Sequence, residues 1–362
     1  MSSGPGASDP EMPAWWIYRG TAQPIDGELS LPAPPPWRSF TGAAPDDGSG
    51  ELPREPGDEA SPSSSRRLGH YRQAVAYRAD DEEINLVNLA LHLRRPLLVT
   101  GQPGVGKSTL AYSVAYELNL GPVLRWTITS RSTLTDGLYQ YDAVGRLQEV
   151  SLQREAARAV SQGAGAPTEI GAYVTLGPLG TALLPRRKPR VLLVDEIDKS
   201  DIDLPNDLLD IFEEGEFTIP ELARLKEQRV TIKTADVGGM ATLAGGRVRC
   251  ADFPVVILTS NNERDFPRAF LRRCIRLEIP PPTEAKLARM VAAHLQPAAT
   301  PEEDVKRQQL IAEFIHKQNS QAAVLANDQL LNALIMAAAG LWDTDQGRQL
   351  IDAHLLRPLD QI

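Results

Sequence analysis

One stretch of the sequence decides its fold: Gly101-Gln102-Pro103-Gly104-Val105-Gly106-Lys107-Ser108. It matches the pattern G-x-x-x-x-G-K-[ST], and it lies between a short apolar run at residues 96–100 and a helical pattern at residues 107–118. A strand, a glycine-rich turn and a helix in this order form a loop whose backbone N–H groups wrap phosphate oxygens. The helix N-terminus adds partial positive charge for the same phosphates. The stretch therefore predicts an α/β domain that binds a nucleotide.

Two side chains of this loop have specific expected roles. Lys107 is expected to reach the β- and γ-phosphates of ATP, and the hydroxyl of Ser108 is expected to bind Mg²⁺. The alternative is a glycine turn that arose by chance, and the strand and helix on either side of the motif argue against it. The other residues expected to line the nucleotide are Gly101, Gln102, Pro103, Gly104, Val105, Gly106 and Thr109.

A pair of acids follows a second apolar run. Residues 191–194 predict a buried strand, and Asp195-Glu196 come at its C-terminal end. Open α/β sheets bind ligands at that edge. We therefore expect Asp195 to hold Mg²⁺, directly or through water, and Glu196 to polarise the water that attacks the γ-phosphate. Many strands end in a solvated acid, so it is the phosphate loop that favours the functional interpretation.

A third polar strand end lies at Asn261. Residues 255–258 form another apolar run, and Thr259, Ser260 and Asn261 follow it. Asn261 is expected to lie beside the γ-phosphate and to orient the attacking water. The alternative is an ordinary asparagine that caps the next turn.

The apolar patterns in the rest of the sequence predict the helices and strands of the whole chain. A helix is expected at residues 80–93, and strands at residues 96–100, 123–128, 191–194, 255–258 and 275–279. Short strands that are apolar on both sides indicate a parallel sheet covered by helices on both faces. After the triple proline at residues 280–282 only helical patterns occur, at residues 283–295, 304–316, 328–341 and 345–355. We expect a Pro-rich leader at residues 1–68, an α/β nucleotide-binding core at 69–280 and a small all-α domain at 281–362.

The leader has a different composition from the rest of the chain. Residues 1–68 hold twelve of the 29 prolines, together with a stretch rich in Ser, Gly, Asp and Glu. Such a composition predicts largely disordered chain. Residues 15–19 and 37–40 are exceptions, because they hold three of the five tryptophans. Two interpretations are open for these aromatic residues: docking to another protein, or folding back onto the chain's own domain.

Bulk composition excludes several classes of function. A formal net charge of −9 provides no general attraction to nucleic acid or to an acidic membrane. The two cysteines, Cys250 and Cys274, form no disulfide framework or metal motif. The longest mostly apolar run, residues 330–342, is shorter than the about 20 residues that span a bilayer. Residues 1–10 lack the basic start and apolar stretch of a signal peptide, so a cytoplasmic protein is expected.

Residues 71–279 resemble a MoxR-type AAA+ ATPase, and the helices after them resemble the AAA+ lid. Four stretches carry the resemblance, in order along the chain: residues 101–108, residues 195–200, residues 206–214 with the strand pattern 217–219, and residues 266–274. The resemblance covers about four-fifths of the chain.

The resemblance implies a homo-oligomeric ring, expected to be a hexamer, with ATP and Mg²⁺ at each subunit junction. It also implies an arginine from the neighbouring subunit that completes the site, and the matching position here is Arg273. The adjacent Arg272 remains the alternative. Partners of the family commonly carry a metal-dependent adhesion domain, so the resemblance implies a protein partner of that kind.

The sequence departs from a minimal AAA+ pattern in three places. Residues 139–184 match the family's extra hairpin before the acidic strand, and residues 220–251 form a second insertion, with Gly-Gly pairs at 238–239 and 245–246 as turn signals. Many AAA+ lids carry a second-sensor arginine at the start of one helix. The comparable stretch here is Ala326-Asn327-Asp328-Gln329-Leu330, without an arginine.

The function expected from these features is that of an ATP-hydrolysing, chaperone-like remodeller of a partner protein. One alternative is a nucleotide-dependent signalling switch. Another is the motor subunit of a nucleic-acid-cleaving complex, with ATP or GTP as its nucleotide. The net charge argues against DNA as a partner, and the absence of an N-K-x-D sequence argues against GTP.

Overall fold

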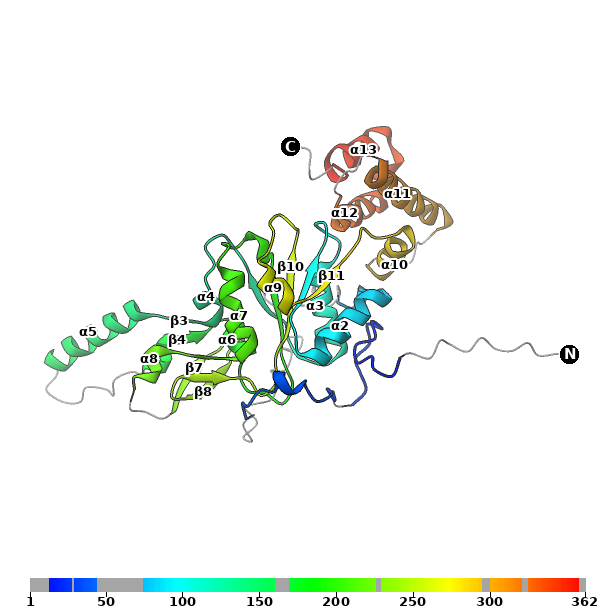
Figure 1. Ribbon diagram of the computed structural model, residues 1–362. Coiled ribbons are helices and arrows are strands. Elements are labelled where there is room, and N and C mark those ends of the chain that lie inside the picture. The colour runs from blue at the N-terminus through cyan, green and yellow to red at the C-terminus, as the bar shows by residue number, and fades with distance from the viewer. Residues whose placement is uncertain are drawn as a thin grey trace.

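A five-stranded parallel sheet lies at the centre of the molecule (Figure 1). The computed structural model describes residues 13–27, 29–43, 74–159, 169–225, 229–294, 300–320 and 325–357. The sheet has the strand order β11-β1-β10-β5-β2, and every neighbouring pair is parallel. Its strands are β1 (Leu97–Thr100), β2 (Leu124–Thr127), β5 (Val191–Asp195), β10 (Val255–Ser260) and β11 (Ile275–Glu278). The predicted α/β class with a parallel sheet is confirmed.

Helices bury both faces of this sheet, as the two-sidedly apolar strands predicted. α2 (Asp81–Leu93) and α3 (Lys107–Glu117) cover one face, where they pack on Val99, Leu193 and Ile257. The opposite face, with Val194 and Leu258, packs against α6 (Pro178–Ala182), α7 (Leu204–Glu214) and α9 (Arg268–Arg273). The carboxyl ends of the strands therefore form one edge between two helical layers.

The two insertions and the strand β6 build a second sheet beside the first. Its order is β3-β4-β7-β8-β9-β6, and β3 and β4 pair as the antiparallel hairpin that the resemblance implied. Its strands are β3 (Tyr139–Tyr141), β4 (Val174–Leu176), β6 (Glu216–Thr218), β7 (Arg229–Lys233), β8 (Met240–Ala244) and β9 (Arg247–Arg249). Between β3 and β4 the helix α5 (Ala143–Ala159) projects away from the body (Figure 1). Short helices α4 (Leu134–Leu138) and α8 (Pro220–Ala223) complete this region.

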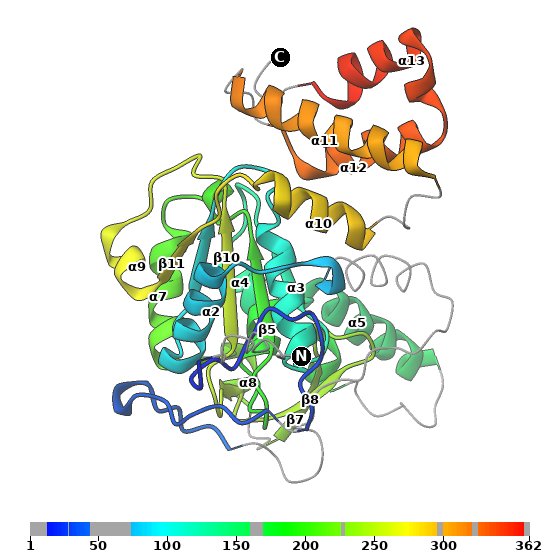
Figure 2. The same cartoon turned by 90° about the vertical axis from the view of Figure 1, so that its right-hand side faces the viewer.

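The last part of the described chain is helical and has its own apolar core. It contains α10 (Glu284–His294), α11 (Pro301–Ser320), α12 (Asn327–Ala338), α13 (Asp345–Leu350) and a π-helical turn, Ile351–Leu355. Phe314, Leu330 and Trp342 are among the side chains buried between these helices. This helical domain lies above one edge of the central sheet in both views (Figures 1 and 2). In the described parts of the chain, no helix is both long and apolar enough to cross a membrane.

The described part of the leader packs against the core, so the expectation of disordered chain is wrong there. We call residues 13–27 and 29–43 the leader strap, drawn in dark blue in Figure 2. Tyr18 is fully buried, and its hydroxyl lies 2.9 Å from Ser113 Oγ in α3. The buried carboxylate of Glu117 accepts hydrogen bonds from the backbone N–H groups of Arg19 and Ala22. Composition predicted disorder because it is an average over the whole leader, in which a few anchoring residues have little weight.

Arg38 is the second anchor of the leader strap. Its buried guanidinium donates to the carbonyl oxygens of Arg94 and Phe212, at 2.6 and 2.7 Å. These carbonyls lie at the C-terminal ends of α2 and α7, where a cation is favourable. The rings of Phe40 and Phe253 lie on the same guanidinium. Folding back onto the chain's own domain is observed for Trp16, Tyr18 and Phe40, whereas the side chain of Trp37 is 77% exposed.

Replacing Asn88 by alanine tests the contribution of the leader strap to stability. Asn88 is fully buried; its Oδ1 accepts from the backbone of Ile17 and Tyr18, and its Nδ2 donates to the carbonyl of Tyr18. The change leaves three buried backbone groups unpaired, so we expect Asn88→Ala to lower the free energy of unfolding by about 3 kcal/mol in urea titrations.

The matched control is Asn85→Ala, on the same helix. Asn85 Oδ1 accepts one hydrogen bond from the leader strap, from Trp16 Nε1. The expected loss is about 1 kcal/mol. Equal losses in the two variants would show that the buried contacts of the leader strap do not stabilise the core.

Candidate functional site

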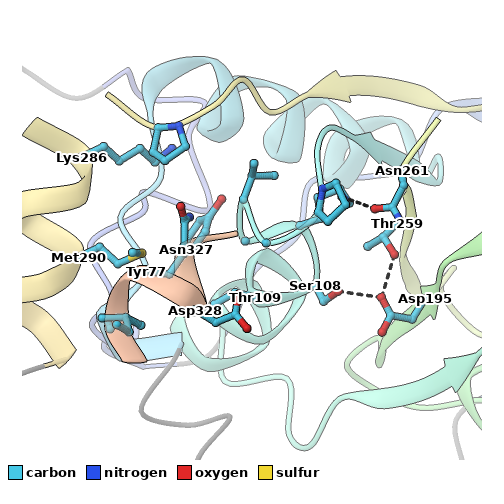
Figure 3. Close-up of a pocket in the computed structure, with 18 of the residues that line it drawn as sticks. Tyr77, Ser108, Thr109, Asp195, Thr259, Asn261, Lys286, Met290, Asn327 and Asp328 are labelled. Carbon is cyan, nitrogen blue, oxygen red and sulfur yellow. Dashed lines mark hydrogen bonds between the residues drawn. The ribbon is translucent and has the colours of Figure 1, made fainter. Parts of the chain in front are cut away.

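A cavity of about 420 Å³ lies at the carboxyl edge of the central sheet (Figure 3). That size is within the range of small-molecule sites. Three parts of the chain line it: the segment just before α2, the phosphate loop with the strand ends behind it, and the helices α10 and α12. The lining residues include Tyr77, Arg78, Lys107, Ser108, Thr109, Arg125, Asp195, Glu196, Asn261, Lys286, Met290, Asn327 and Asp328.

The phosphate loop requires glycine at two positions. Gly106 precedes α3 with φ of 101°, a left-handed conformation that other residues rarely adopt. At Gly104, with φ of 77°, an added Cβ would lie 2.4 Å from the Cβ of Ala326. The turn conformation therefore restricts both positions to glycine, and close packing of the helical domain on the loop restricts Gly104 further.

Lys107 lies inside the loop, as expected for the residue that meets phosphate. Its Nζ donates to the carbonyl oxygens of Gly101 and Gln102 and to Asn261 Oδ1, at 2.7, 2.8 and 2.7 Å. Burial lowers the pKa of Lys107, and the carboxylates of Asp198, Asp195 and Glu196 oppose that shift. The side chain is thus a fixed cation that three acids help to keep charged.

Asp195 is the most heavily bonded side chain of the cavity. Its Oδ1 accepts from Ser108 Oγ at 2.7 Å and from Thr259 Oγ1 at 2.8 Å, and its Oδ2 accepts from Arg125. Burial acts to raise the pKa of Asp195, but the hydrogen bonds from Ser108, Thr259 and Arg125 outweigh it and hold the pKa below its ordinary value. A serine hydroxyl beside an ionised carboxylate is a donor set that suits Mg²⁺ together with phosphate oxygens.

Glu196, the expected base, has an unusual backbone conformation. Its φ of 62° places a non-glycine residue in the left-handed region, a strain that is typical of functional sites. The hydroxyl of Thr259 accepts a hydrogen bond from its N–H at 2.9 Å. Its carboxylate forms an ion pair of 2.7 Å with Lys199, and both side chains are partly exposed. The carboxylate therefore lines the cavity but has a cation of its own chain beside it.

Asn261 faces the loop rather than capping the next turn with its side chain. Its Oδ1 accepts from Lys107, and its backbone N–H donates to Asp198 Oδ2 at 2.8 Å. Asp198 also accepts from the backbone of Glu263, so it fixes the start of this loop. The structure thus brings the expected residues Lys107, Asp195 and Asn261 to one wall of the cavity.

Sequence reasoning missed Thr259 and Arg125. Thr259 contacts both acids, because its hydroxyl donates to Asp195 and accepts from the backbone of Glu196. It is the residue two before Asn261 on the same strand, so its place at the binding edge was visible in the sequence. Arg125 could have been noticed as a charged side chain within a short strand, residues 124–127, next to the acidic strand.

The helical domain supplies the opposite wall of the cavity. Lys286 of α10 forms ion pairs with Asp80 and Glu83 of α2, at 2.6 and 2.7 Å. Asn327 and Asp328, at the start of α12, line the cavity. The Oδ1 of Asn327 is buried without a hydrogen-bond partner in the described structure. On this side the cavity is therefore lined by the amide of Asn327 and the carboxylate of Asp328.

Arg273 and Arg272 do not line the cavity of their own chain. Arg273 ends α9 and donates from Nε to Glu213 Oε1 of α7 at 2.6 Å. Its side chain is 40% exposed, and Arg272 beside it is exposed as well. The structure leaves both arginines on the α7 side of the sheet.

Comparison with protein families places the core of this site in a known class. Residues 96–274 match the AAA domain of the dynein-related subfamily. The matched part begins just before β1 and ends at Cys274, so it contains the phosphate loop, the two acids, Asn261 and α9. The matched residues, about half of the chain, are thus similar to an AAA domain. A comparison with curated proteins gave no match.

Thr259→Val tests whether the threonine orients the two acids. Valine keeps the shape but removes the hydrogen bond to the ionised Asp195 and the acceptor for the Glu196 N–H. A hydrogen bond to a charged group contributes about 1.5–3 kcal/mol, so we expect kcat/KM for ATP to fall about tenfold to a hundredfold. Thr259→Ser keeps the hydroxyl and is expected to stay near the native rate. Equal rates in the valine and serine variants would remove Thr259 from the site.

Proposed function

We propose that this chain binds and hydrolyses ATP in the cavity between the AAA core and the helical domain. The observation that carries the proposal is one continuous set of contacts: Ser108, Asp195, Thr259 and the backbone of Glu196 are joined by hydrogen bonds, with Lys107 and Asn261 beside them. This arrangement supports the proposal, because phosphoryl transfer to water needs phosphate-binding, metal-binding and basic groups close together.

Each of these groups has a role in the proposed reaction. Lys107 and the loop N–H groups hold the phosphates, and Ser108 and Asp195 hold Mg²⁺, which neutralises charge on the phosphates when it is bound. Glu196 takes the proton of the attacking water, and Asn261 orients that water. Tyr77, Met290 and Leu331 offer apolar surface for the base on the other side of the cavity.

We propose further that the chain acts as a ring, with Arg273 of one subunit completing the site of the next. Two features support this. Arg273 lies outside its own cavity, and its pair with Glu213 is half exposed and therefore weak. Arg272 is adjacent on α9 and remains the alternative.

The work done by the ring is proposed to be chaperone-like remodelling of a partner protein, as in MoxR-type ATPases. The projecting helix α5 supports this reading, because it exposes Val144, Leu147 and Leu152, each about two-thirds accessible. A partner with a metal-dependent adhesion domain follows only from the resemblance. A nucleotide-dependent switch is the second candidate, favoured by the Glu196–Lys199 ion pair and by the lack of an arginine at the start of α12.

Glu196→Gln separates ATP binding from hydrolysis. The amide keeps the shape of the side chain but cannot take a proton, so we expect ATP affinity near native and turnover lower by at least about a hundredfold. Calorimetry and phosphate release measure the two quantities. Hydrolysis at the native rate would rule out Glu196 as the base.

Mixing two inactive variants tests the ring and the arginine together. Lys107→Ala has a defective cavity with an intact Arg273, and Arg273→Ala has the reverse. Each alone should show little turnover, whereas Arg273→Ala should still bind ATP, because its charge meets the phosphate chiefly in the transition state. Mixed assemblies should regain part of the activity, since some junctions combine an intact cavity with an intact arginine.

Subunit exchange has to be demonstrated in the same mixtures. No recovery of activity despite exchange would contradict the action of Arg273 across the junction. Recovery with Arg272→Ala but not with Arg273→Ala would assign the role to Arg272.

A further inference from the structure

Arg125 lies on the strand next to the acidic strand and on the same face of the sheet as α3. In the register of β2 and β5, Arg125 is opposite Leu193 and Thr127 is opposite Asp195. Leu193 packs in the core under α2 and α3, and Asp195 follows it by two residues, so Arg125 and Asp195 share that face. The arginine can therefore reach the proposed metal carboxylate along the sheet surface.

Arg125 and Asp195 are in close contact, but the two side chains differ in how deeply they are buried. Arg125 donates from Nη2 and Nε to Asp195 Oδ2, at 2.5 and 3.1 Å. The carboxylate side chain is 7% exposed, whereas the arginine side chain is 46% exposed and lines the cavity. A buried carboxylate needs a counter-cation, and here that cation reaches it from the ligand side.

The ion pair between Arg190 and Asp236 serves as a comparison, because its arginine is fully buried. Arg190 is fully buried and donates through both Nη atoms to Asp236, at 2.9 Å each, and to the carbonyl of Pro122. That arginine is fixed from several directions. Among the described residues Arg125 pairs with one carboxylate, that of Asp195, and its side chain is 46% exposed.

Orientation of Asp195 does not depend on Arg125. The hydroxyls of Ser108 and Thr259 both donate to Oδ1 and fix the carboxylate from α3 and β10. What Arg125 adds is positive charge, at the same carboxylate that the proposed function assigns to Mg²⁺. A guanidinium and a divalent ion on the same carboxylate would repel each other enough to weaken metal binding about tenfold, even at the dielectric constant of water.

We infer that Arg125 is an exchangeable counter-cation of the carboxylate that would hold Mg²⁺: with metal and nucleotide bound, the guanidinium would leave Asp195 and contact the phosphates that enter the cavity. This inference rests on the proposed ATP function and deepens it. The exchange keeps a cation on the buried carboxylate at every stage. It also gives the phosphates a second side-chain cation beside Lys107, because an arginine fork suits phosphate oxygens.

The test measures metal and nucleotide binding separately, in the full chain. Arg125→Gln should bind Mn²⁺ alone about tenfold tighter than the native protein, by electron paramagnetic resonance, because the competing charge is gone. The same variant should bind ATP several-fold more weakly in EDTA, because one phosphate contact is lost. Arg125→Lys retains a cation, so its Mn²⁺ binding should stay close to native, and its ATP binding in EDTA should fall less than in Arg125→Gln. Arg131→Gln, an exposed arginine six residues further on, is the matched control and should change neither.

The outcomes are distinct. Unchanged or weaker Mn²⁺ binding in Arg125→Gln would overturn the exchange, while ATP binding by the native protein would leave the proposed function standing. Failure of the native protein to bind ATP with Mg²⁺ would overturn both.

A crystal structure of the native protein with Mg²⁺ and a non-hydrolysable ATP analogue covers the case of a variant that does not fold. There Arg125 should lie beyond hydrogen-bonding distance of Asp195 and contact phosphate oxygens. A persisting Arg125–Asp195 pair in that structure would exclude the exchange.

Discussion

The rest of the site depends on one buried, ionised carboxylate at the end of β5. Asp195 is 5% exposed, and an isolated charge at that depth would be strongly unfavourable. It is stabilised by groups from three other elements: Ser108 from α3, Thr259 from β10 and Arg125 from β2. These contacts join the strand ends to the phosphate loop, so the order of the parallel strands also sets the geometry of the chemistry. Thr259 extends the constraint to Glu196, whose left-handed backbone needs a partner for its N–H.

Much of this arrangement could be predicted from sequence because it repeats a local pattern. The phosphate loop needs glycine at Gly106 for its backbone, and Asp195 and Asn261 each end an apolar strand, so all three positions follow from short stretches. Thr259 and Arg125 could not be assigned in the same way, because their partners are 64 and 70 residues distant in the chain. Their roles depend on the β2-β5-β10 register, which local periodicity does not reveal.

For the leader, the amino-acid composition predicted less ordered structure than residues 13–27 and 29–43 have. A segment rich in proline and polar residues cannot form a core of its own, but it can add anchors to an existing one. Tyr18 fills a space beside α3, and Asn88 satisfies the backbone around it in place of a neighbouring strand. Fixing such a strap costs conformational entropy, so its few anchors have to be well bonded. The sequence signal was present in residues 15–18, Trp-Trp-Ile-Tyr, which are more apolar than the rest of the leader.

Glu213 connects the leader strap to the arginine proposed to act across the ring. Its Oε2 lies 3.2 Å from the buried Arg38, and its Oε1 lies 2.6 Å from the half-exposed Arg273. The two bonds differ in strength for a physical reason. Arg38 is also held by the carbonyls of Arg94 and Phe212, so it stays in place, whereas the exposed pair with Arg273 contributes at most about 1 kcal/mol. Arg273 can therefore leave Glu213 for a phosphate at little cost, and Glu213 keeps a partner when it does. A surface arginine that is positioned by a carboxylate, yet weakly bound to it, combines the two properties that a catalytic arginine donated to a neighbouring subunit requires.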